Sequence, residues 1–254
     1  MDINETSKKM KSRHPWELSR TKCVLKSMDS YLTDIHKTGD KKSYLNIGAG
    51  DMYFDRALMK KWKKDALYAV DIGYAEQEKQ GSRVHKYKYL EEIEENNFDY
   101  ALMMDSLEYM EDEVEYVKKL CGKLKPGGMI FFTLPSFQKL FSEHDVIVKL
   151  LRRYDRKSFA RIINEIPEIE IVEEHFFYFS LLCVRCLQKW LHLPIDPKHE
   201  VTTGWRFEEK GIVTKLVTGF LNLDYRTGAF LNKHNIWLPG LSLFIVCRKD
   251  NRNE

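Results

Sequence analysis

The feature that most constrains the fold is a regular alternation of short apolar segments with amphipathic ones. Strand-like segments occur at 43–47, 66–72, 84–89, 98–104, 129–135, 169–175 and 240–249. Helical patterns occupy 16–38, 54–64, 111–128 and 155–166, mostly between these segments. Strands that alternate with helices predict an α/β fold whose mostly parallel sheet has helices on both faces.

A glycine-containing turn follows the first of these strands, in "YLNIGAGDMYF" at 44–54. Gly48 and Gly50 stand directly after the apolar run, Asp71 ends the second strong strand, and Asp105 follows the strand at 98–104. An open parallel sheet binds its ligands at the carboxyl ends of its strands. The sequence therefore predicts one crevice that gathers these four residues.

Composition and charge narrow the class of protein. The 254 residues include 41 basic and 38 acidic side chains, a net charge of +3, which argues against a dedicated nucleic-acid binder. The polar start "MDINETSKKM" does not resemble a secretory leader, and no apolar run approaches the ~18–20 residues of a membrane span. Five cysteines, an odd number, indicate reduced thiols, so we expect a cytoplasmic protein.

The pair Cys183 and Cys186 has the C-x-x-C spacing but lies alone in an amphipathic segment, and we predict no metal site there.

Four segments together resemble the class I S-adenosylmethionine-dependent methyltransferases: "LNIGAGD", "AVDI", "FDYALMMDSLEYM" and "LKPGGMIFFTLP". The resemblance covers roughly 44–175 and returns at 241–248. It implies a Rossmann-like sheet of seven strands with an antiparallel last strand, and S-adenosylmethionine as the cofactor. "HPWELSR" and "SEHDVIVKLLRRYDRKSF" resemble one bacterial branch of the family.

On this basis, residues 1–40 are expected to form an N-terminal helical segment and residues 41–254 the methyltransferase domain. Before the last strand, a helical insertion at about 176–240 is expected to form a lid, an acceptor-binding surface or an interface. Its aromatic stretch "FFYFSLLCVRCLQKWLHLP" also leaves open a peripheral contact with a membrane. The oligomeric state is left undetermined.

The resemblance also implies the cofactor-binding residues. The turn at 48–50 would leave room for the cofactor, Asp71 would bind the ribose hydroxyls, and Arg20 would pair with the cofactor carboxylate. The residues expected at the cofactor are Arg20, Asn46, Gly48, Ala49, Gly50, Asp71, Ile72, Asp105 and Leu107.

Two positions depart from the pattern of the family. Asn46 stands where an aspartate is common, and Tyr109 where a histidine is frequent. These departures leave open a degenerate protein that binds the cofactor without catalysis.

Residues after the strand at 129–135 are candidates for the acceptor side. His144 is the candidate general base, with Glu143 or Asp145 to orient it, because histidine titrates near neutral pH. Arg152 and Arg153 are candidates for binding an anionic acceptor, and Tyr154 for lining its pocket.

The function predicted is methyl transfer to a small molecule or to a glycan- or lipid-linked precursor. A non-catalytic cofactor-binding or interaction protein and an RNA methyltransferase are the alternatives. The incomplete glycine pattern disfavours a nicotinamide-dependent oxidoreductase, and the absence of an "NPPY"-like tetrapeptide disfavours methylation of a planar nitrogen of adenine or glutamine.

Overall fold

The computed structural model describes residues 13–75, 81–94, 96–191 and 211–251. Its single sheet has the order β3-β2-β1-β4-β5-β7-β6, with β7 antiparallel to both of its neighbours. The remaining pairs are parallel, as the sequence predicted. The strands are β1 (Ser43–Ile47), β2 (Ala66–Val70), β3 (Val84–Tyr87), β4 (Phe98–Met104), β5 (Leu124–Pro135), β6 (Ile169–Phe177) and β7 (Ser242–Lys249).

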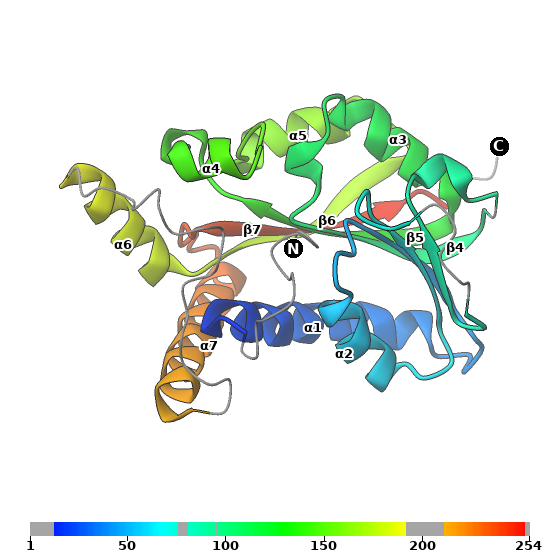
Figure 1. Cartoon of the computed structure of the whole chain (residues 1–254), viewed down its shortest axis with the longest axis horizontal. Helices are drawn as coiled ribbons and strands as arrows, with labels where there is room; N and C mark the ends of the chain where they lie inside the picture. Colours follow the sequence, from blue (N-terminus) through cyan, green and yellow to red (C-terminus); the bar gives the residue numbers. More distant parts are fainter. Residues whose placement is uncertain (1–12, 76–80, 95, 192–210, 252–254) are drawn as a thin grey trace.

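Helices cover both faces of the sheet (Figure 1). One layer contains α1 (Pro15–Ile35), α2 (Tyr53–Lys61) and α7 (Ile212–Lys233); the other contains α3 (Glu113–Lys123), α4 (Glu143–Ile147) and α5 (Arg156–Asn164). The helix α6 (Phe179–Trp190) extends from the end of the sheet at which β7 begins. The described residues also include the short 3-10 turns η2 (Leu90–Glu92), η3 (Leu107–Tyr109) and η4 (Gln138–Leu140).

The alternation of side chains along each strand divides the core into two layers. Leu45 and Ile47 of β1 belong to the cluster that packs under α3 and α5, whereas Tyr44 belongs to the cluster under α1, α2 and α7. Every residue of β4 is buried, as expected for a central strand covered on both faces.

The helix expected over 111–128 is shorter than predicted, and this is a correction. It ends at Lys123, and β5 begins at once with Leu124, which is buried and pairs with Phe98. The "KPGG" at the end of the expected helix instead lies in a register shift of the sheet, where Gly127 has a φ of 74°.

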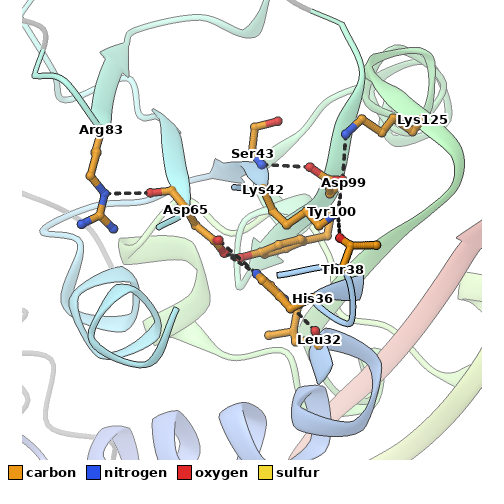
Figure 2. Close-up of polar contacts among 10 residues, drawn as sticks. All are labelled: Leu32, His36, Thr38, Lys42, Ser43, Asp65, Arg83, Asp99, Tyr100 and Lys125. Carbon is orange, nitrogen blue, oxygen red and sulfur yellow. Dashed lines mark hydrogen bonds and ion pairs between the residues drawn. The ribbon is translucent and has the colours of Figure 1, made fainter. Parts of the chain in front are cut away.

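A polar network closes the sheet edge opposite the predicted crevice (Figure 2). Asp65, just before β2, lies against the His36 imidazole at 2.9 Å and accepts a hydrogen bond from the Tyr100 hydroxyl at 2.8 Å. Asp99 accepts bonds from the Ser43 amide and the Lys125 ammonium. These contacts attach the end of α1 to the amino ends of the strands and leave the carboxyl ends for binding.

Candidate cofactor site

The glycine turn after β1 is built around close backbone approach. Gly48 and Gly50 have φ values of 73° and 53°, which favour glycine. A Cβ at Gly48 would lie 2.7 Å from the Cβ of Ser106, the second residue after β4. Position 48 therefore needs glycine because of this contact and its φ, whatever ligand lies beyond.

Asp71 lies directly after β2 and is fixed against that turn. One carboxylate oxygen accepts a hydrogen bond from the Gly50 amide at 2.8 Å, and the other accepts from the Gly73 amide at 2.9 Å. Each oxygen keeps a further lone pair for another donor. The neighbouring Ile72 is 77% exposed and offers an apolar surface beside the carboxylate.

Asn46, which departs from the family pattern, has a specific partner. Its side-chain amide donates to the carboxylate of the fully buried Asp55, on α2, at 2.7 Å. Burial raises the pKa of Asp55 to about 6, while hydrogen bonds from Asn46 and Tyr44 oppose that rise. The acidic group absent from position 46 is therefore present on α2, in direct contact with Asn46.

The first turns of α1 lie over the carboxyl ends of β1 and β4. Arg20 forms an ion pair with Asp105, which also accepts a hydrogen bond from the Thr133 hydroxyl at 2.9 Å. The Arg20 guanidinium lies 4.5 Å from the ring centroid of Trp16. Arg13 forms a second ion pair, with Asp51 of the glycine turn.

These two ion pairs join α1 and the residue just before its N-cap to two separate loops of the crevice. Arg20 and Asp105 were both predicted from the sequence, but their pairing was not, and neither Arg13 nor Asp51 was predicted. The "GAGD" motif contains Asp51, but nothing local in the sequence indicates its partner.

Four of the eight buried side-chain polar atoms that lack a hydrogen-bond partner in the described residues lie at the same edge of the sheet. They are Asn46 Oδ1 on β1, Ser106 Oγ and Glu108 Oε2 just after β4, and Ser136 Oγ just after β5; the other four are Trp62 Nε1, Arg83 Nη2, His175 Nε2 and Asn232 Oδ1. Such atoms are rare in proteins, since each loses its hydrogen bonds to water on burial. Their concentration at the carboxyl ends of three strands fits a polar ligand.

Glu108, one of these residues, has a strongly raised pKa. Burial raises the pKa of its carboxyl to about 8, although the charges of Arg20 and Arg153 oppose the rise. The carboxyl is therefore mostly neutral at pH 7. Leu107 beside it is fully buried among the core residues of β4, β5 and α3.

The three candidates for acceptor binding have partners within the chain. Arg153 contacts both carboxylate oxygens of the buried Asp145, at 2.7 and 3.1 Å. Arg152 forms an ion pair with Glu113, which also accepts a hydrogen bond from the buried Tyr154 hydroxyl at 3.1 Å. These contacts hold the segment after β5 against α3 and α4.

His144 is exposed on the short helix α4. Within the described ranges, no hydrogen bond or ion pair involves its imidazole. Asp145 is one of the two groups expected to orient it, but its carboxylate accepts hydrogen bonds from Ser142 and Arg153 instead. The other, Glu143, is exposed.

Cys183 and Cys186 are exposed free thiols on α6. The described part of the chain contains no group of three or more histidine, cysteine or acidic residues placed to hold a metal ion. Among the helices it contains, none is long and apolar enough to cross a bilayer.

Comparisons with known proteins agree with this geometry. Residues 24–181 match the model of a family described as a methyltransferase domain. The plantazolicin methyltransferase BpumL, solved with S-adenosylhomocysteine, superposes with a TM-score of 0.54 at 13% identity, covering 91% of this chain and 84% of that one. A protein described as a sarcosine dimethylglycine methyltransferase, from Galdieria sulphuraria, gives 0.52 at 14% identity, covering 90% and 87%. None of the curated proteins matches the sequence.

The chain belongs to the methyltransferase domain family, since the family model matches more than half of it. It is a class I methyltransferase with S-adenosylmethionine as its cofactor. The structural neighbours share the fold at low identity and do not identify the acceptor. Any proposal for the acceptor therefore rests on the residues of the crevice.

Proposed function

We propose that this methyltransferase acts on a small molecule or on a glycan- or lipid-linked precursor. The observation that carries the proposal is the group of unpartnered buried polar atoms at the carboxyl ends of β1, β4 and β5. They support a polar ligand held inside the fold. A duplex nucleic acid would instead need a broad basic surface, and the chain has a net charge of only +3.

The same geometry supports a proposal for the cofactor residues. Asp71 binds the ribose hydroxyls through its free lone pairs, and Ile72 packs on the adenine. Gly48, Ala49 and Gly50 hold the backbone close to the ligand. Arg20 binds the carboxylate of the methionyl group, in exchange for part of its contact with Asp105.

S-adenosylmethionine supplies an activated methyl group, so the chain itself has mainly to align the acceptor. An acceptor hydroxyl also needs a base, and His144 is proposed for this role because its exposed imidazole follows β5, whose end lies at the crevice. Arg152, Arg153 and Tyr154 are proposed to contact an anionic part of the acceptor, which would then compete with Glu113 and Asp145.

The test has two stages. Calorimetry with S-adenosylhomocysteine measures cofactor binding, and incubation with methyl-labelled S-adenosylmethionine and a cell extract measures transfer. Label in a small-molecule, glycan or lipid fraction supports the proposal. Binding without transfer favours the non-catalytic alternative, and nuclease-sensitive label favours an RNA acceptor.

Once an acceptor is found, His144→Ala tests the base. We expect turnover to fall about a hundredfold with unchanged cofactor affinity, as for loss of a general base. Val146→Ala, on the same short helix and also exposed, is the control and should retain most of the turnover. Ordinary turnover in His144→Ala would remove the histidine from the mechanism.

A further inference from the structure

The helix α7 has an exposed apolar stripe on the side that faces away from α1 and β6. Its opposite side packs on α1 and β6 through Thr214, Leu221 and Tyr225, which are buried. The stripe comprises Ile212, Leu216, Phe220, Leu223 and Phe230, with exposed fractions from 57% for Phe220 to 77% for Ile212.

The stripe is narrow and straight. With about 100° of rotation per residue, four of its members fall within an arc of about 40°, with Phe220 beside them. A helix of 22 residues presents it over roughly 30 Å. An apolar stripe of this length on a helix surface indicates that something covers it.

The charges along α7 indicate what covers the stripe. Lys215, Arg226 and Lys233 are exposed, and their spacing of 11 and 7 residues places all three on one edge of the stripe. The one acidic residue of α7, Asp224, accepts hydrogen bonds from the Phe179 and Ser180 amides at the start of α6. The exposed charges of the helix are therefore all positive.

The neighbouring α6 has the same character. Val184, Leu187 and Trp190 recur at helical spacing and are exposed, and its two charged residues, Arg185 and Lys189, are basic. Figure 1 shows α6 and α7 at the same end of the molecule, where β7 begins. Pro135 at the end of β5 pairs there with Ser242, so the carboxyl ends that form the cofactor crevice point to this end too.

We propose that the outer stripe of α7 docks on an anionic lipid bilayer. A helix with an apolar side and basic flanks lies in the plane of the membrane interface, with lysine and arginine against the anionic headgroups. A second copy of the chain fits less well, because an antiparallel symmetric contact through α7 would bring the basic edges of the two copies near one another. Docking does not depend on the acceptor or on the methyl-transfer reaction.

The experiment is co-sedimentation of the full chain with two kinds of vesicle. One kind contains phosphatidylglycerol and phosphatidylcholine, the other phosphatidylcholine alone. We expect binding to the anionic vesicles that weakens as salt is raised, and little binding to the neutral ones.

Two variants separate the apolar and the electrostatic contributions. Leu216→Ser/Leu223→Ser and Lys215→Glu/Arg226→Glu should each reduce partitioning by about tenfold or more. The matched controls are Val172→Ser on β6 and Lys60→Glu/Lys118→Glu on α2 and α3, whose residues are exposed outside α7 and which should bind as the wild type does.

Three results would overturn the proposal. They are absence of binding to anionic vesicles, equal loss in the test and control variants, and a stable dimer in light scattering that Leu216→Ser/Leu223→Ser dissociates. Circular dichroism of the same variants reports whether they fold. Calorimetry with S-adenosylhomocysteine reports cofactor binding separately, so failure to dock and failure of the methyltransferase proposal remain distinguishable.

Discussion

The neutral carboxyl of Glu108 predicts an unusual pH dependence of stability. Its pKa is about 8 in the folded chain, against an ordinary value of 4.5. The folded chain therefore holds this proton more tightly than the unfolded chain. Glu108 contributes most to stability below about pH 4.5, and this contribution is lost as the pH rises toward 8 and above.

The magnitude follows from the two pKa values. One pKa unit corresponds to about 1.4 kcal/mol, so ionising Glu108 in the folded chain costs roughly 5 kcal/mol at high pH. Between pH 5 and pH 8, the part of the transition that is easy to measure, linkage gives a loss of roughly 3 kcal/mol. This is a large fraction of the stability of an ordinary domain.

Glu108→Gln keeps the shape of the side chain and removes the titration. We expect its free energy of unfolding, from urea titrations followed by tryptophan fluorescence, to lack this loss of roughly 3 kcal/mol between pH 5 and pH 8. The difference between variant and wild type isolates Glu108, because Asp55 and other titrating groups are common to both. Glu115→Gln, the same change at an exposed position on α3, should follow the wild type. Parallel pH profiles for wild type and Glu108→Gln would refute the reasoning.

The remaining predictions concern the cofactor site. Asp71→Ala should weaken binding of S-adenosylhomocysteine in calorimetry by roughly 1.5–3 kcal/mol, and unchanged affinity in a folded variant would remove Asp71 from the site. Gly48→Ala should lower the free energy of unfolding by roughly 1–3 kcal/mol, because its φ is positive and its Cβ meets Ser106; a fully stable variant would contradict this. Asn46→Asp should destabilise the chain by roughly 2 kcal/mol or more at pH 8, since it places a second carboxylate against Asp55, and by less at pH 5, where the two can share a proton. Equal effects at both pH values in urea titrations would count against that contact.

The strands and the glycine turn were predictable because their signals are local. Apolar runs of strand length, the two glycines after β1 and the acid after β2 are each visible within a few residues. The parallel arrangement then places the ends of these strands together without any knowledge of side-chain contacts. The extent of β5 was not predictable in the same way, because Leu124 pairs with Phe98 of β4 and nothing local in "LKPGG" indicates that pairing.

The contacts that define the electrostatics of the site join residues far apart in the sequence. Arg20 meets Asp105 across 85 positions, and Arg13 meets Asp51 across 38. Periodicity shows which side of a helix is apolar, but it does not show which loop a polar residue near the helix start will reach. The burial of Glu108 could not be predicted either, because an acidic residue in "DSLEY" is typical of a solvated turn. Its burial depends on the segment after β5, which packs over it.

Asn46 shows why a departure from a family pattern is read best together with its contacts. Taken alone, the loss of an acid beside a cationic cofactor suggested a degenerate enzyme. In the folded chain Asn46 donates to Asp55, whose pKa of about 6 leaves it mostly ionised at neutral pH. The negative charge that the family pattern places on β1 therefore lies on α2 in this chain, one hydrogen bond away from Asn46. An aspartate at both positions would force two carboxylates together in a buried place, so Asn46 is the residue that allows Asp55 to keep its charge.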